Sequence, residues 1–279
     1  MNLKVQAEKN RGKRMTSASA FGFGVLEVGI SQYFLGKVLA GLGGFLTIPL
    51  LTRGLGVEGY GQLSLGLIVA NWMPYIAGGW LQQSVLRYHK SYKLTDNYPD
   101  YLRTVRVCQV AVSVICGLVS LFVLSLVGVG SWMDRGLVAI ISFLNANYFL
   151  YVAVFQAELK PPFIVWSDFA RTATPAVLIA AQLIALKYLK SSHAYGYIAF
   201  AMLVANFFLS VRIWKLRKGD GRFAKDILGK LFLYGIPMGV WFAFSAFQVF
   251  VGRFVLQFLS MQKDLGLYSA FQDFLIKGG

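Results

Sequence analysis

A set of cationic and amide side chains stands inside apolar stretches of this sequence. The cations are Lys37, Arg53, Arg171 and Arg253. The amides are Asn71, Asn145, Asn147, Gln182, Asn206 and Gln248. Such groups cost free energy in hydrocarbon, so they face the interior of a helix bundle or a water-filled cavity. A cation there also needs water or a partner of opposite charge, and the excess of cations over acids favours an anionic ligand.

These residues also have structural explanations that involve no ligand. An amide can join two helices by a hydrogen bond, which contributes about 0.6 kcal/mol in membrane proteins. Arg53 and Arg253 lie at the ends of apolar stretches, where a long side chain can extend to the membrane interface. The sequence alone does not decide between contacts with a ligand and these structural roles.

The apolar stretches are long enough to cross a bilayer. The chain has 279 residues, of which 57% are hydrophobic and only 14% charged, and its mean hydropathy is +0.59. A soluble domain would carry about 25% charged residues. Several stretches contain no Asp, Glu, Lys or Arg: 59–86, 107–133, 136–157, 194–211 and 231–252.

Two weaker stretches, 28–52 and 163–186, contain only Lys37 in the first and Asp168 and Arg171 in the second. An eighth begins at Leu265. Because about 20 apolar residues cross a hydrocarbon core of about 30 Å, the sequence predicts an all-α, polytopic transmembrane helix bundle. It has seven membrane spans and part of an eighth.

The distribution of Lys and Arg predicts the orientation. If the N-terminus is cytoplasmic, the cytoplasmic segments hold about three times as many basic residues as the outer ones, as the positive-inside rule requires. The net charge of +15 is then explained by contact with anionic lipid headgroups, and we expect no binding to nucleic acid.

Enzymatic chemistry is not indicated. The chain has no pair of acids suited to sugar hydrolysis, and His89 and His193 fall in loops predicted on opposite sides. Cys108 and Cys116 read as small packing residues rather than metal ligands. We therefore expect no catalytic residue, no metal and no cofactor. Prolines within spans, which bend helices, suit a transporter: Pro49, Pro74, Pro175 and Pro237.

A short pattern occurs twice. Arg53 is followed by Glu58-Gly59-Tyr60-Gly61, and Arg253 is followed by Gly266-Leu267-Tyr268. The interval is six spans, which predicts parallel repeats related by an axis along the membrane normal, with a site between them. The predicted organisation is a basic cytoplasmic segment 1–27, a first lobe of six helices 28–214, a basic cytoplasmic loop 215–230, and the start of a second lobe 231–279.

The first of these motifs resembles a known family. Residues 49–61, PLLTRGLGVEGYG, are similar to the first-helix signature of the Wzx-type polysaccharide and O-antigen flippases of the MOP (multidrug/oligosaccharidyl-lipid/polysaccharide) superfamily. The similarity continues at Arg253 and at 266–268, although Gly252 stands where an aspartate is common in the family. In this interpretation Arg53 lies at the mouth of a cavity, and Tyr60 anchors the next helix at the membrane interface.

The resemblance implies a function. Such proteins move a lipid-linked oligosaccharide, usually on undecaprenyl pyrophosphate, across the bacterial cytoplasmic membrane. The cations named above are then candidates for contacts with the pyrophosphate, and the amides for contacts with the sugar. Implied partners are the lipid-linked oligosaccharide, membrane lipids, and the polysaccharide polymerase and chain-length proteins. Family members usually have 12 to 14 spans, so this chain is expected to be a C-terminally truncated or partial one.

Three rival hypotheses remain. One is a flippase of the same superfamily that moves lipid II or another lipid. A MATE-like cation-coupled exporter shares the superfamily architecture, but such proteins usually hold an acid in the first lobe, where this sequence offers Asp168 near the inner end of a span and Glu27 before the first span. A non-transporting membrane scaffold for polysaccharide assembly would depend on the loops at 88–104 and 212–230 rather than on a cavity.

Overall fold

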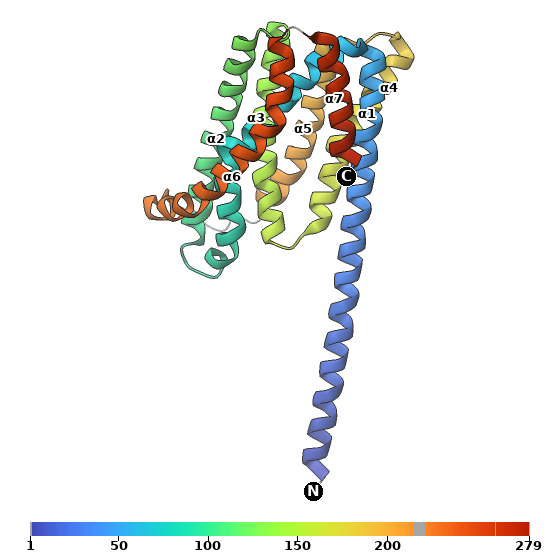
Figure 1. The fold of residues 1–279 in the computed structure, drawn as a ribbon. Coiled ribbons are helices and arrows are strands. Elements are labelled where there is room, and N and C mark those ends of the chain that lie inside the picture. The colour runs from blue at the N-terminus through green and yellow to red at the C-terminus, as the bar shows by residue number, and fades with distance from the viewer. Residues whose placement is uncertain (1, 215–220, 260, 279) are drawn as a thin grey trace.

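The expected all-helical fold is confirmed. The computed structural model describes residues 2–214, 221–259 and 261–278, with the side chains of 34–213, 221–245, 247–248, 251–259 and 261–275. All regular structure in these ranges is helical (Figure 1). The elements are α1 (Asn2–Lys93), α2 (Tyr98–Val127), α3 (Trp132–Ala157), α4 (Pro161–Leu186), α5 (Ser191–Trp214), α6 (Lys225–Phe258) and α7 (Gln262–Gly278).

Among the described residues, 6 helices are long and apolar enough to cross a membrane, α1 to α6. The apolar part of α1, Phe34–Lys93, has 60 residues, which is about 90 Å of helix and enough for two crossings. It bends at Gly56, whose φ of 72° and ψ of 172° suit only a residue without Cβ. The predicted spans 28–52 and 59–86 are therefore the two halves of α1, and the incomplete eighth span is α7, with 17 residues.

The turns alternate between two ends of the bundle (Figure 1). We call the end that holds Gly56, the turns 128–131 and 187–190, and the C-terminal end of α6 the Gly56 end. The opposite end, with turns 94–97 and 158–160, is the Glu158 end. Sequence predicts that the Glu158 end is cytoplasmic. Of the predicted basic loop there, residues 215–220 with Lys215, Arg217 and Lys218 lie outside the described residues.

Some predicted boundaries were wrong. The sequence predicts one span over 107–133, but α2 ends at Val127 and α3 begins at Trp132. Gly128 ends α2 with φ 70°, and Ser131 and Asp134 form a capping box that starts α3. The turn between them carries no charge, so hydropathy alone could not mark it. Helix α6 begins at Lys225, so the last part of the predicted loop 215–230 is helical, and the division into cytoplasmic loop and second lobe stays a prediction.

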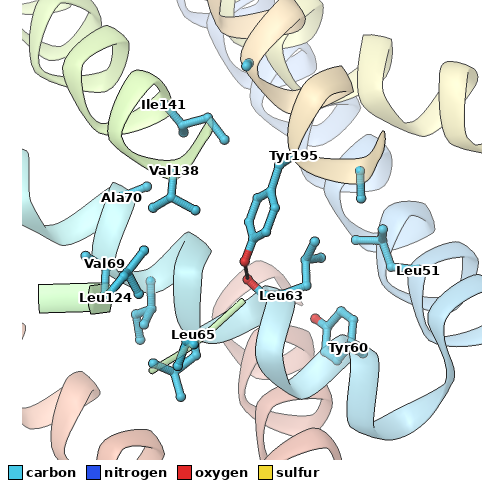
Figure 2. Packing of buried hydrophobic residues seen from close by; sticks show 14 of the residues in the cluster. Leu51, Tyr60, Leu63, Leu65, Val69, Ala70, Leu124, Val138, Ile141 and Tyr195 are labelled. Atoms are coloured by element: carbon cyan, nitrogen blue, oxygen red, sulfur yellow. Dashed lines mark hydrogen bonds between the residues drawn. The ribbon is translucent and has the colours of Figure 1, made fainter. Parts of the chain in front are cut away.

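The main apolar core lies around the second half of α1. Leu63, Leu65 and Val69 are fully buried there, against Val138 of α3 and Tyr195 of α5. Figure 2 shows the Tyr195 ring entering this core, where its hydroxyl donates a hydrogen bond of 3.0 Å to the Leu63 carbonyl. The buried hydroxyl is thereby satisfied, and α5 is fixed to α1.

Helices α6 and α7 pack mainly on α1 and little on each other. Gly235 and Gly239 of α6 face Trp80 of α1, and Ser84 Oγ donates a hydrogen bond of 2.6 Å to the Leu231 carbonyl. This spacing of small residues lets two membrane helices approach closely. Near the Gly56 end, a Cβ on Gly61 would lie 2.9 Å from the backbone nitrogen of Gly266. The division into two lobes stays a prediction.

Candidate functional site

Two of the predicted cations meet at one carboxylate. Lys37 of α1 donates to Asp168 Oδ2 of α4 at 2.6 Å. Arg171, one turn further along α4, lies with its Nη2 3.5 Å from Asp168 Oδ1. The side chain of Asp168 is only 8% exposed, whereas that of Lys37 is 49% exposed. The carboxylate is therefore enclosed while one of its cations reaches the surface of the described chain.

Helix α3 completes this arrangement. The Tyr148 hydroxyl donates to Asp168 Oδ1 at 2.6 Å and lies 3.2 Å from Ser167 Oγ. Lys37, Tyr148, Ser167, Asp168 and Arg171 thus form one connected group, which we call the Asp168 cluster. It joins α1, α3 and α4. With two cations and one carboxylate, its formal charge is positive.

The cluster lies inside helices that are long and apolar enough to cross a membrane, so by length and composition it falls at membrane depth. Asp168 is about 10 Å along α4 from its start at Pro161, and about 28 Å from its C-cap at Lys187, at 1.5 Å per residue. The cluster is therefore nearer the Glu158 end than the Gly56 end. Ionisable groups at such depth are costly and mark ligand or ion pathways in membrane proteins.

Arg171 is the less engaged of the two cations. Its contact with Asp168, at 3.5 Å, is long for a charge-assisted hydrogen bond, which prefers about 2.8 Å. Its guanidinium carbon lies 5.0 Å from the centre of the Tyr148 ring, a cation–π contact. Its buried Nε has no hydrogen-bond partner in the described residues. Arg171 can therefore donate to a further acceptor.

The third predicted cation belongs to a separate group near the Gly56 end. Arg253 of α6 donates to Asp273 Oδ1 at 2.6 Å and to Gln272 Oε1 at 2.9 Å, both on α7. Tyr60 of α1 donates to Asp273 Oδ2 at 2.6 Å. We call Tyr60, Arg253, Gln272 and Asp273 the Asp273 cluster. Gly252 stands where the family that this sequence resembles often carries an aspartate, so the residue before Arg253 cannot pair with it. The carboxylate that pairs with Arg253 comes from α7 instead.

Three predicted amides form hydrogen bonds that join α3 to α1 or to α5. Asn145 of α3 is fully buried, and its Nδ2 donates to Asn71 Oδ1 and to the Ala70 carbonyl of α1. Asn206 Nδ2 of α5 donates to the Leu144 carbonyl of α3 at 3.0 Å. The amide oxygens of Asn145 and Asn206 are buried and have no partner within the described part of the chain.

The remaining predicted residues are not brought together. Asn147 accepts from Gln109 Nε2 at 2.9 Å, on the side of α3 turned away from Asn145. Gln182 donates to the Tyr188 carbonyl, near His193 at the Gly56 end. Arg53 and Gln248 are exposed and make no hydrogen bond or ion pair with any described residue.

Comparisons with known proteins agree with this architecture. The sequence profile of the family described as "Polysaccharide biosynthesis protein" matches residues 27–276. The chain belongs to this polysaccharide biosynthesis protein family. No curated protein sequence matches it. The resemblance found in residues 49–61 is thus confirmed at the level of the family.

Two solved structures, each of a transporter, are similar to this polysaccharide biosynthesis protein. An outward-facing multidrug resistance MATE family transporter of the MOP superfamily has a TM-score of 0.54 and 13% identity; the alignment covers 88% of this chain and 64% of that one. A MOP superfamily transporter from Pyrococcus furiosus has a TM-score of 0.49 and 14% identity, covering 88% and 61%. The first likeness shows the fold. The chain spans less than two thirds of the length of either transporter.

Sequence reasoning missed several residues that hold these clusters. The sequence indicates Asp168 only as the acid that an exporter would need, and it gives no signal that Tyr148 or Asp273 belongs to a site. Tyr60 was expected at the membrane interface, but it is buried and bonded to Asp273. An acid inside an apolar stretch is the one signal that could have identified Asp168, because such an acid requires a cation nearby.

A further ionic group lies beyond the apolar stretches, at the Glu158 end. Glu158, the C-cap residue of α3, accepts from Lys93 Nζ at 2.6 Å and contacts His89 Nε2 at 2.9 Å. Burial by itself would raise the pKa of Glu158, but hydrogen bonds from Lys93 and His89 outweigh it and hold that pKa below its usual value. This group ties the end of α1 to the turn after α3.

Proposed function

We propose that this polysaccharide biosynthesis protein takes part in moving a lipid-linked oligosaccharide, carried on a polyprenyl pyrophosphate, across the bacterial cytoplasmic membrane. It does so as a multi-pass transporter and not as an enzyme. Family membership supports the link to polysaccharide synthesis. The helical fold supports transport, since it is similar to that of a MOP superfamily transporter.

The observation that carries the proposal is the excess positive charge of the Asp168 cluster at membrane depth. A pyrophosphate is a multiply charged anion, and moving it through the bilayer requires cations that replace its water. Lys37 and Arg171 lie on both sides of one carboxylate, and Arg171 retains an unused donor. The planar guanidinium of Arg171 and the flexible ammonium of Lys37 can both donate hydrogen bonds to the phosphate oxygens.

The location of the cluster suits loading from the cytoplasmic leaflet. It lies nearer the Glu158 end, which the distribution of Lys and Arg predicts to be cytoplasmic. Lys37, half exposed, would meet the phosphate first. The amides Asn71, Asn145, Asn147, Gln182, Asn206 and Gln248 remain candidate sugar contacts, as Arg53 and Arg253 remain candidate phosphate contacts.

A cation-coupled exporter is the second candidate, because Asp168 is an acid buried in the first lobe. The contacts of Asp168 argue against this role. Its oxygens already receive Lys37, Tyr148 and Arg171, so a cationic drug or metal ion would meet like charges.

The test is complementation in a strain that lacks the native gene. Lys37→Ala and Arg171→Ala should each lower the amount of surface polysaccharide about tenfold, since a hydrogen bond to a charged group contributes about 1.5–3 kcal/mol. The control is Lys90→Ala, which removes an exposed cation of α1 at the Glu158 end. Membrane levels of each variant are measured in parallel. Wild-type polymer in both cluster variants would refute the phosphate site.

A further inference from the structure

We propose that Asp168 is an internal substitute for the phosphate of the substrate. It holds Lys37 and Arg171 between transport events and gives them up when a polyprenyl pyrophosphate arrives. The inference rests on the proposed function and adds to it a residue that sets how tightly the substrate is held.

The first argument is that Asp168 engages both cations at once. Oδ2 receives Lys37 and Oδ1 faces Arg171, as two oxygens of one phosphate would. Without an anion between them, two cations at this depth would be unpaired in a medium that penalises each of them. Asp168 therefore keeps the empty site stable.

The second argument is that the cations can leave while Asp168 stays in place. Lys37 is half exposed and has a flexible stem, and the contact of Arg171 with the carboxylate is long. By contrast, Tyr148 of α3 donates to Asp168 at 2.6 Å. This neutral donor keeps one hydrogen bond on the carboxylate after the cations turn to a ligand, so exchange of partners needs only side-chain rotation.

The consequence concerns release. Two unopposed cations would bind a pyrophosphate tightly and let it go slowly. A built-in carboxylate competes for the same donors, which weakens binding and favours departure of the product. Removing Asp168 should therefore tighten binding and slow transport, the opposite of the effect expected for a residue that contacts the substrate directly.

The experiment uses the purified full chain in detergent and farnesyl pyrophosphate as the probe, with farnesol as the ligand that lacks the charged group. Asp168→Asn should bind the pyrophosphate about tenfold more tightly than the wild type, and Lys37→Ala and Arg171→Ala more weakly. Asp264→Asn is the control, because Asp264 is an exposed acid in the first turn of α7, near the other end. It should leave the affinity unchanged.

A second pair of variants covers a failure of Asp168→Asn to fold. Lys37→Gln with Asp168→Asn removes both members of the ion pair, and it should bind more tightly than Lys37→Gln alone because Arg171 is freed. If Asp168→Asn binds the pyrophosphate no more tightly than the wild type, while Lys37→Ala and Arg171→Ala bind it more weakly, this inference is overturned and the proposed function still stands. Equal binding of farnesol and farnesyl pyrophosphate by the wild type would overturn the proposed function and this inference with it.

Discussion

Arg253 and Asp273 form an ion pair of 2.6 Å between α6 and α7, with only 2% of the Arg253 side chain exposed. The second carboxylate oxygen of Asp273 accepts from Tyr60. A helix of the predicted second lobe is thereby tied to α1, close to the Gly56 end. Because the guanidinium is buried, its partners determine whether this contact is stable.

Loss of this pair should weaken the contact between α7 and the rest of the chain. Arg253→Ala leaves Asp273 without its cation and should cost about 3 kcal/mol, measured as a lower unfolding temperature in detergent. Exchanging the charges, with Arg253→Asp and Asp273→Arg together, should recover part of the loss. Lys263→Ala, at an exposed position of α7, serves as control. An Arg253→Ala protein as stable as the wild type would contradict this role.

Close approach of α6 to α1 requires glycine at position 235. A Cβ there would lie 2.6 Å from Ser84 Oγ and would also collide with the Trp80 carbonyl. Gly235→Ala should therefore destabilise the protein by about 1–3 kcal/mol. Gly229 of the same helix has open space around it, so Gly229→Ala should be neutral or slightly stabilising. Thermal unfolding of the two variants side by side tests the packing, and equal effects would argue against it.

Stability should fall in acid through Glu158. Its folded-state pKa lies below its usual value, so the ionised carboxylate stabilises the fold above the unfolded-state pKa of about 4.3, and this contribution is lost as the pH falls through the folded-state value. As the pH falls below about 5, through the unfolded-state value toward the folded-state value, the unfolding temperature of the wild type should drop more than that of Glu158→Gln. Parallel curves for the two proteins would exclude this contribution.

The predicted sugar contacts should separate into two groups. Asn145 is buried and joins α3 to α1, so Asn145→Ala should lower stability by about 1–3 kcal/mol, the cost of unpaired buried groups. Gln248 is exposed, and Gln248→Ala should leave stability unchanged. A drop in polysaccharide with Gln248→Ala at normal protein levels would then report on the substrate, whereas the same drop with Asn145→Ala would require correction for folding.

The helical fold was predictable because long uncharged stretches of sequence by themselves indicate membrane-spanning helices. Uncharged stretches such as 136–157 and 194–211 coincide closely with α3 and α5. The sequence failed where a turn carries no charge, as at Gly128 to Ser131, because hydropathy does not distinguish an apolar turn from a helix. A positive-φ glycine and a capping box mark that turn instead.

The candidate site was predictable only by residue type. Lys37 and Arg171 were identified because a cation in an apolar stretch needs a partner, but the partner of Lys37 lies 131 positions away. Tertiary packing determines which faces of α1 and α4 meet. The pattern of apolar and polar residues in a single sequence does not predict this packing. For the same reason Arg53 and Arg253, which look equivalent in the repeat, differ: one is exposed and the other is buried in an ion pair.

The most direct test of the central claim is the leaflet in which lipid-linked repeat units reside after deletion of the native gene. Their sugars are probed with a membrane-impermeant lectin, first on intact inner-membrane vesicles of known orientation and then after permeabilisation. We predict loss of surface polysaccharide together with accumulation of repeat units on the cytoplasmic leaflet, reversed by the wild-type gene. Repeat units distributed between the leaflets as in the parent strain, with surface polymer unchanged, would contradict the account.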